Sequence, residues 1–493
     1  MTSSPGLAWS AQRGSARLAR ASVRAPLESQ AVARDKIPTS RVGRTAKIGG
    51  LAAGQAIRQA GTRAANVTRT KEGRQAALER RHIEAAEQIV AALGTMKGAA
   101  MKVGQVMSFL DVGVVPEQYR AEFQRRLATL RDAAPTVTFK DMRKVIEDEL
   151  DGPLGEAFDE FEQEPIAAAS IGQVYRAKLT DGRQVAVKVQ YPGVAAAVRA
   201  DMQNLGLILR LAKRIAPGMD PKAIGEEIRD RIEEELDYEL EAQNQRTLGR
   251  IFRGHPFIVV PQVVTSLSRE RVLVTEYLEG TGFEELKGYP HRERDRIAEI
   301  LFRFYFGCLY RHRQFSGDPH PGNMLLLADG RVGFFDFGLF KRMPPGTVEL
   351  EIAVARAIID GDTETIMRLG TETGFFPDPK RFNPDRVLAH FRAATSWYTV
   401  DRDVELSPEY ATQVLIDMSD PRSEYFGQLR HESAPPDHIF GRRMEVLTLA
   451  VIAQLHARGN FHRIAREWFY GDEPATELGR EEAEFYGSLV ARR

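Results

Sequence analysis

The chain has 493 residues, enough for two or three domains of ordinary size, and 43% of them are hydrophobic while 28% are charged. Basic and acidic residues number 68 each, so the chain has no global field that would recruit nucleic acid or an anionic membrane. This composition predicts a soluble globular protein with a sizeable core and no nucleic-acid partner.

The first 80 residues are rich in Arg, Ala, Ser and Gly and contain only four acidic residues. We therefore expect a basic, largely unpacked extension over residues 1–78, which could contact anionic lipid reversibly. The same composition is also typical of an organellar transit peptide, but Ala and Arg are abundant along the whole chain, so we favour the extension.

Cys308 is the single cysteine, which excludes an intrachain disulfide and favours a reducing, cytoplasmic compartment. Its apolar neighbours predict a buried structural thiol. No apolar run reaches the length of a membrane span, so any membrane contact should be peripheral.

Helical periodicity becomes clear from Glu79 onward. Residues spaced by three and four predict one apolar helix face, made of Ile89, Leu93, Met96, Ala100, Val103, Met107 and Leu110. Lys102 and Gln105 lie beside this face. A second helix is expected from Pro116 to about Arg131, and both belong to a helical segment over residues 79–135.

Beyond this segment the period changes to that of strands. We expect strands at Ala169–Leu179 and Arg183–Tyr191, helices at about Val194–Ile215 and Lys222–Arg250, and a strand pair at Pro256–Val264 and Arg271–Tyr277. After Arg292 the chain should be largely helical, apart from a hairpin over Met324–Phe335. The order predicts an α+β fold with two unequal lobes, over residues 136–275 and 276–400, and a helical extension over 401–493.

Two loops of the second lobe carry residues suited to phosphoryl transfer. Asp318 and Asn323 are five residues apart in a turn-rich segment, and Asp336-Phe-Gly338 follows after the short hairpin. Phosphoryl transfer needs oxygen ligands for Mg²⁺ and a carboxylate near the attacking hydroxyl. We therefore predict Asn323 and Asp336 as metal ligands and Asp318 as the catalytic acid, since this spacing is similar to that of protein kinases.

A lysine lies within a strand of the first lobe. Lys188 stands among apolar neighbours in Val185-Ala-Val-Lys188, where it is costly to bury unless it meets an anion. The phosphates of ATP would serve, with Glu241 as a second partner. The alternative is an edge lysine that points to solvent.

The sequence resembles the UbiB/AarF family of atypical protein-kinase-like proteins, also called the coenzyme Q kinase-like family. Four motifs carry the resemblance, which covers roughly residues 80–400: Lys102-Val-Gly104-Gln105, the alanine-rich Ala167–Ser170, Glu235-Leu-Asp237, and Asp318–Asn323 with Asp336–Gly338.

The resemblance implies a role for each motif. The alanine-rich segment stands where a protein kinase has its glycine-rich loop, so its residues are expected to contact the nucleotide: Ile166, Ala167, Ala168, Ala169, Ser170, Ile171, Gly172, Gln173 and Val174. Lys188 would contact the phosphates and pair with Glu241 at the nucleotide site, and the hinge with Glu276 and Leu278 would meet adenine. The helix with Lys102, Gly104 and Gln105 would be a lid that excludes a protein substrate.

The lid lysine would meet an acid of the Glu235-Leu-Asp237 motif. Asp237 and Glu241 are four residues apart, so on one continuous helix they would share a face while Glu235 points elsewhere. One helix could then offer separate acids to Lys188 and Lys102.

These observations predict an ATP-dependent atypical kinase or ATPase that uses Mg²⁺ or Mn²⁺ and supports isoprenoid quinone or related lipid metabolism. Two alternatives stay open: a nucleotide-binding scaffold without turnover, and a phosphotransferase for aminoglycosides or choline-like alcohols. The phosphoryl acceptor and any protein partner are not specified by the sequence.

Overall fold

The computed structural model describes residues 137–169, 171–200, 221–419 and 436–491, together with Met202, Leu209 and Glu432. The predictions for the basic extension and for the lid segment with Lys102, Gly104 and Gln105 lie outside the described residues, as does Ser170. The α+β fold class is confirmed by the part of the chain described below.

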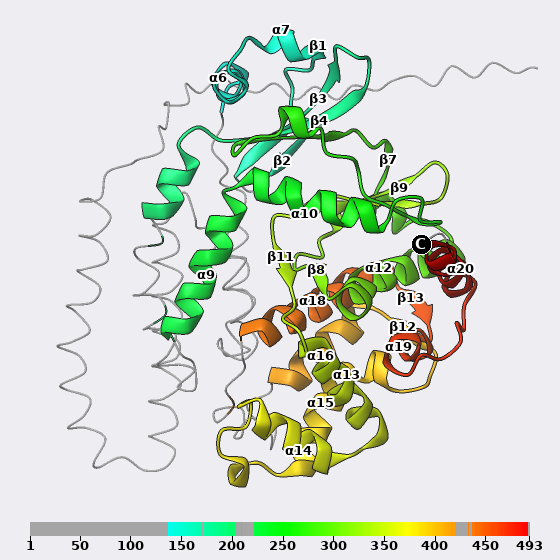
Figure 1. The fold of residues 1–493 in the computed structure, drawn as a ribbon. Helices are drawn as coiled ribbons and strands as arrows, with labels where there is room; N and C mark the ends of the chain where they lie inside the picture. The colour runs from blue at the N-terminus through cyan, green and yellow to red at the C-terminus, as the bar shows by residue number, and fades with distance from the viewer. Residues whose placement is uncertain are drawn as a thin grey trace, which may run out of the picture. The chain divides into compact units, whose positions relative to one another are not determined.

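A five-stranded antiparallel sheet forms the first lobe (Figure 1). Strands β1, β3, β4 and β6 follow one another across it, and β2 pairs with β3. The bounds are Phe158–Phe161 for β1, Ala167–Ala169 for β2, Gly172–Leu179 for β3, Gln184–Gln190 for β4 and Val272–Glu276 for β6. Helices α6 (Phe139–Leu150) and α7 (Leu154–Ala157) precede the sheet, and the buried side chains of α6 pack into its core.

The second lobe combines a small sheet with many helices. The sheet has the order β5-β10-β9-β7, from Ile258–Val259, Val332–Phe334, Met324–Leu327 and Gly280–Gly282. Two further strand pairs are β8 (Gln314–Ser316) with β11 (Phe340–Arg342), and β12 (Val404–Leu406) with β13 (Ala457–Gly459). The expected hairpin over Met324–Phe335 is confirmed by the antiparallel β9 and β10.

The helices of the second lobe and its extension are α11 (Phe283–Leu286), α12 (His291–His312), α13 (Thr347–Asp360), α14 (Thr363–Glu372), α15 (Pro384–Thr399), α16 (Pro408–Ser419), α18 (Pro436–Ala453), α19 (Phe461–Phe469) and α20 (Glu477–Ala491). Short 3₁₀ turns lie at Thr265–Leu267, Pro321–Asn323 and Pro379–Arg381. None of the helices in the described ranges is long and apolar enough to cross a membrane.

The single helix expected over Lys222–Arg250 is wrong, because the chain forms two helices there. Helix α9 (Pro221–Glu235) ends before Asp237, and α10 (Tyr238–Ile251) begins after it. The Asp237 carboxylate accepts hydrogen bonds from the backbone N–H groups of Glu239 and Leu240, which makes it the N-cap of α10. An aspartate in this position satisfies the open N–H groups of a new helix better than it continues an old one.

The strand expected over Pro256–Val264 is also largely wrong. Only Ile258 and Val259 form a strand, and they pair in parallel with β10 of the second lobe instead of with β6. Contact with β6 is reduced to one bridge between Val263 and Thr275. A proline at 261 has no N–H to donate, which prevents a regular ladder across this segment.

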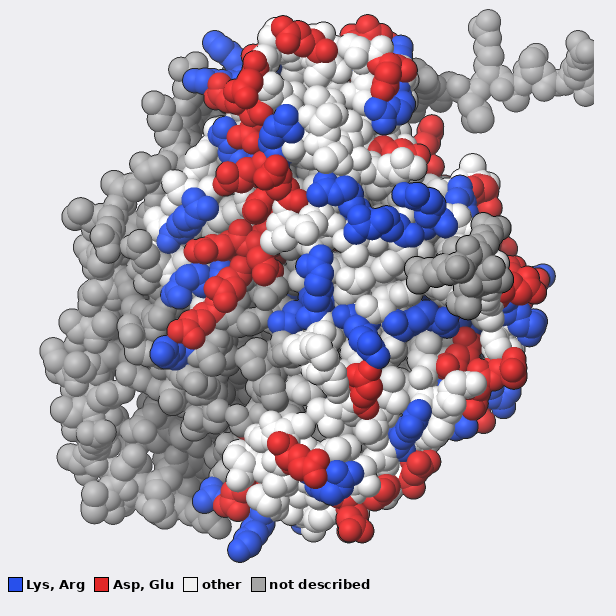
Figure 2. All heavy atoms as spheres, viewed as in Figure 1, with Lys and Arg blue, Asp and Glu red and all other residues white. Residues whose placement is uncertain are grey.

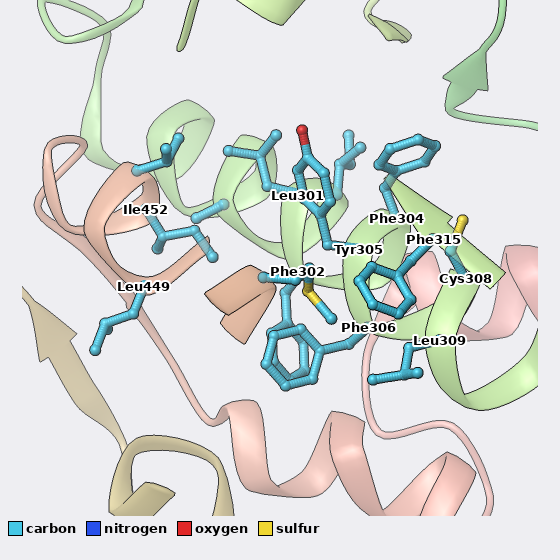
Figure 3. Packing of buried hydrophobic residues seen from close by; sticks show 14 of the residues in the cluster. Leu301, Phe302, Phe304, Tyr305, Phe306, Cys308, Leu309, Phe315, Leu449 and Ile452 are labelled. Atoms are coloured by element: carbon cyan, nitrogen blue, oxygen red, sulfur yellow. The ribbon is translucent and has the colours of Figure 1, made fainter. Parts of the chain in front are cut away.

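Helix α12 is the central element of the second-lobe core. Its residues from Ile297 to Tyr310 are buried apart from the half-buried Glu299, and Figure 3 shows several of them packed against Phe315, Leu449 and Ile452. The Phe304 ring stacks on that of Phe334, with 3.7 Å between ring centroids. Because Phe334 ends the strand before Asp336, this contact fixes the loop that carries the predicted metal ligand. Cys308 is buried in the same core, as expected.

A buried ion-pair cluster joins the C-terminal helices to α12. Arg303 is 1% exposed, and its guanidinium donates to the carboxylates of Glu299, Glu467 and Glu482 at 2.7–3.0 Å. A buried cation needs such partners, because burial without them would cost several kcal/mol. The extension after residue 400 is therefore an integrated part of the second lobe.

Candidate active site between the two sheets

Lys188 lies in the centre of the first-lobe sheet. In β4 it stands between Val174 of β3 and Leu273 of β6, so it is not the edge lysine of the alternative interpretation. Its Nζ donates to both carboxylate oxygens of Glu241, at 2.8 and 2.9 Å. The predicted Lys188–Glu241 pair is thus present in the structure, and the lysine side chain is 16% exposed.

A second carboxylate lies near the same lysine. Asp336 Oδ2 is 3.6 Å from Lys188 Nζ, which brings a residue of the second lobe to the first-lobe pair. Burial alone would lower the pKa of Lys188, but the carboxylates of Asp336 and Glu241 outweigh it and raise that pKa above its ordinary value. The lysine therefore stays protonated while it is paired with these two carboxylates.

The loop after β10 is held in an unusual backbone conformation. Asp336 has a φ of 79°, in the left-handed region that is uncommon for residues other than glycine. Its Oδ1 accepts the N–H of Gly338, and the N–H of Phe337 points at Glu241. From α10, Asn244 donates to the Phe337 carbonyl. Such backbone strain persists only where neighbours enforce it, and it concentrates at functional sites.

The turn-rich loop before β9 orients the two other predicted residues. The Asn323 side-chain amide donates through Nδ2 to the Asp318 carbonyl at 3.2 Å, which leaves its Oδ1 for another partner. His320 accepts the N–H of Gly322 through Nδ1, which stabilises the loop. Burial raises the pKa of Tyr305 well above its ordinary value, and Asp318 and Asp336 contribute to this increase.

An arginine that the sequence analysis missed holds Asp318. Arg443 of α18 donates through Nη2 to Asp318 Oδ1 at 2.8 Å, and this arginine is 8% exposed. Burial lowers the pKa of Arg443 to about 10, against the opposing effects of Asp318 and Glu235. A signal was present in the sequence: two consecutive arginines, Arg442 and Arg443, interrupt a helix with many apolar residues.

The alanine-rich segment forms strand β2, which pairs with β3 next to the strand that carries Lys188. Ala167, Ala168 and Ala169 of β2 pair with Val174, Gln173 and Gly172 of β3, and Ile166 is 46% exposed. A Cβ at Gly172 would lie 2.1 Å from the Val189 carbonyl oxygen, so only glycine permits this approach of β3 to β4. The Ile171 carbonyl accepts the N–H of Tyr191, which fixes the turn against β4.

The predicted hinge follows β6. Glu276 exchanges backbone and side-chain hydrogen bonds with Gln262, and the Tyr277 N–H donates to the Gln184 carbonyl. Leu278 packs onto β10, where a Cβ at Gly333 would lie 2.7 Å from its Cδ1. The hinge residues therefore join the two sheets, and their contact with adenine stays a prediction.

The Glu235-Leu-Asp237 motif is arranged differently from the expectation. Asp237 is the N-cap of α10 and lies outside the helix, so it does not share a helix face with Glu241. Glu235, expected to point elsewhere, lies at the end of the acidic helix α9 (Figure 2), and its Cγ is within 3.8 Å of where a Cβ of Gly338 would stand. Glu235 is thus the motif acid nearer to the site, because the helix break turns α9 and α10 in different directions.

The residues present fit a divalent cation with few protein ligands. Asp336 offers a carboxylate that is 36% exposed, and Asn323 offers the amide oxygen left by its hydrogen bond to Asp318. Mg²⁺ is usually bound by one or two such groups together with phosphate oxygens and water. No cluster of three or more His, Cys, Asp or Glu side chains arranged for a metal occurs in the part of the chain that the structure describes.

Comparison with known proteins identifies the family. A model of the ABC1 atypical kinase-like domain matches residues 129–370. The rat (Rattus norvegicus) atypical kinase COQ8B, mitochondrial, is 32% identical over 72% of this chain and 67% of its own length. The chain belongs to the ABC1 (UbiB/AarF) family of atypical kinase-like proteins.

Two further similarities agree with this assignment. The Caenorhabditis elegans atypical kinase coq-8, mitochondrial, is 28% identical over 89% of this chain, which spans 59% of that relative's length. A solved complex of Rv3197 with erythromycin from Mycobacterium tuberculosis is 30% identical, with a TM-score of 0.58 over 81% of this chain and 98% of that one. The two-lobed kinase-like fold predicted from the sequence is confirmed.

The contact between Arg443 and Asp318 leads to a prediction. Replacing Arg443 with glutamine should lower kcat for ATP about tenfold and leave the KM for ATP within roughly twofold, because the change removes a charged hydrogen bond from Asp318, the predicted catalytic acid, and not from the predicted phosphate contacts. Steady-state turnover of the variant measures both constants, and Arg443→Lys should restore part of the loss.

A matched control is Arg458→Gln, which removes an exposed arginine paired with Glu405. Thermal unfolding of both variants separates a loss of folding from a loss of turnover. A rise in KM with unchanged kcat, or an equal effect of the control, would contradict the proposed orientation of Asp318 by Arg443.

Proposed function

We propose that the chain binds Mg·ATP between its two sheets and either hydrolyses it or transfers the γ-phosphoryl group to a small molecule or lipid. The observation that supports this most strongly is the arrangement of Lys188, Glu241 and Asp336, in which two lobes contribute charges to one point. In this proposal Lys188 binds phosphate oxygens, Glu241 keeps the lysine in place, and Asp318 orients the attacking hydroxyl or water.

Asn323 and Asp336 would hold the Mg²⁺ ion. When bound, the metal supplies positive charge next to the phosphate oxygens. The fixed positions of these groups matter more than their basicity, because phosphoryl transfer depends chiefly on placement and charge stabilisation. The hydrogen bond from Asn323 to the Asp318 carbonyl links the metal ligand to the catalytic acid.

The proposed substrate class comes from the family. We propose a role in isoprenoid quinone or related lipid metabolism, which the names of the COQ8 relatives support. The basic residues of the first 80 positions suggest reversible contact with an anionic membrane, since each can contribute roughly 1 kcal/mol at such a surface. We place the protein in a reducing compartment, and the mitochondrial names of two relatives keep a transit peptide open as the alternative.

One experiment separates this proposal from its alternatives. Purified full-length protein is incubated with γ-labelled ATP and Mg²⁺, with and without anionic vesicles and isoprenoid phenols, and both free phosphate and labelled acceptor are counted. We expect ATP turnover that depends on Mg²⁺ and increases with the lipid or phenolic additives.

Other results would favour the other functions. Tight Mg·ATP binding without turnover under every condition would indicate a scaffold. Transfer of label to an aminoglycoside or a choline-like alcohol would indicate a small-molecule phosphotransferase. Erythromycin is a reasonable further additive, because a 30% identical protein was solved with this macrolide.

A further inference from the structure

A pocket lined by arginines lies next to the hinge and shares Glu276 with the proposed nucleotide site. Its volume is about 420 Å³, within the size range of small-molecule sites. The lining comes from the end of α10, the segment after it, the hinge residue Glu276, and Arg331 of the turn before β10. Neither Lys188 nor any residue of the loops with Asp318 and Asp336 is among the residues that line it.

Four arginines line this pocket, and they face a single glutamate there. Arg246 and Arg250 lie on α10, Arg253 follows the helix, and Arg331 comes from the turn before β10. Arg331 is paired with Asp329 at 2.6 Å. Arg246, Arg250 and Arg253 have no carboxylate partner among the described residues, and Figure 2 shows basic side chains grouped over this part of α10.

The three unpaired arginines lie on one side of the chain. Arg246 and Arg250 are four residues apart on α10 and so are neighbours on one helix face, and Arg253 lies in the turn that follows the helix. Three guanidinium groups at one pocket supply more paired N–H donors than a single phosphate group needs, which favours a ligand with two linked phosphates.

The pocket walls are firmly held, so the arginines are presented by a fixed framework. Gln245 donates to the Pro261 carbonyl at 2.8 Å, which fixes α10 to the opposite wall. Glu276 accepts the N–H of Gln262 with its carboxylate and donates its own N–H to the Gln262 carbonyl. A guanidinium group recognises phosphate oxygens through paired N–H donors, which favours an anion over other polar ligands.

We propose that this arginine pocket is a second binding site, for a soluble small molecule that carries a diphosphate group. The pocket is half-open, its volume fits a small ligand, and the three unpaired arginines supply the charge. A phospholipid headgroup has related chemistry, so the experiment includes vesicles to separate the two sources.

The test uses inorganic pyrophosphate as the probe, titrated calorimetrically into full-length protein without divalent metal. The pocket variant is Arg246→Gln/Arg250→Gln/Arg253→Gln. The control variant, Arg292→Gln/Arg368→Gln/Arg402→Gln, removes the same charge from exposed arginines elsewhere. We expect pyrophosphate affinity to fall at least roughly tenfold in the pocket variant and to change less than about twofold in the control.

Further binding measurements distinguish this site from the nucleotide site. Lys188→Ala should still bind pyrophosphate at the pocket, and the pocket variant should still bind Mg·ATP like the wild type. Failure of Mg·ATP binding in the wild type would count against the proposed function alone. Thermal unfolding confirms that each variant is folded.

Three outcomes would overturn the second site. They are unchanged pyrophosphate affinity in the pocket variant, an equal loss in the control variant, and complete loss in Lys188→Ala. If the pocket variant loses binding only to vesicles that contain phosphatidic acid, while pyrophosphate binding persists, the soluble ligand is excluded.

Discussion

Replacing Lys188 with alanine is expected to reduce ATP turnover by roughly 100-fold or more, the size of effect seen when one donor to a developing phosphate or oxyanion charge is removed. The lysine is held at 2.8 Å from Glu241 and 3.6 Å from Asp336, so its charge is already placed where the phosphates are proposed to bind. Comparison of turnover and of the dissociation constant for ATP, measured on the same preparation, gives the result.

The substitution also leaves Glu241 buried without its cation. Glu241 is 2% exposed, so some loss of stability is expected, and turnover should be measured well below the unfolding midpoint. Lys178→Ala is the control, because Lys178 lies on the neighbouring strand β3 and pairs with Glu160 away from the site. Normal ATP affinity and turnover in folded Lys188→Ala would show that the lysine is only structural.

Replacing Asp336 with asparagine is expected to lower turnover by a similar factor of roughly 100 or more and to raise the Mg²⁺ concentration needed for half-maximal rate. Asparagine is nearly the same size, and it tolerates the left-handed backbone that Asp336 adopts with a φ of 79°. The change therefore removes a charge with little disturbance of the loop.

The Mg²⁺ titration decides what Asp336 does. Asp385→Asn, on the exposed start of α15, controls for the loss of one acidic residue. If the variant keeps the wild-type Mg²⁺ dependence and loses only stability, Asp336 serves mainly as a partner of Lys188. Loss of turnover with a shifted Mg²⁺ requirement supports its assignment as a ligand.

The sequence predicted the features that depend on local spacing. The Lys188–Glu241 pair, 53 residues apart in the chain, is an exception, because it was predicted from the need of a buried lysine for an anion. The hairpin between the two loops follows from two short segments with strong strand and turn patterns. The hydrogen bonds of such segments form between residues close in the sequence, so the surrounding fold changes these segments little.

The features that were missed have two different causes, a local helix cap and a long-range contact. The acidic stretch around Asp237 looks like one amphipathic helix, and only the hydrogen bonds of its carboxylate show that it begins a new one. Arg443 is 125 residues from Asp318 in the chain, so helical periodicity could place it on α18 but could not show what it contacts.

The most direct test of the nucleotide site is a crystal structure of the full-length protein with Mn²⁺ and a non-hydrolysable ATP analogue, in which anomalous scattering locates the metal. We expect one Mn²⁺ coordinated by the Asn323 amide oxygen, an Asp336 carboxylate oxygen and phosphate oxygens, with Lys188 Nζ in contact with the phosphates. A metal bound without these two residues, or a nucleotide bound away from Lys188, would contradict the proposed site.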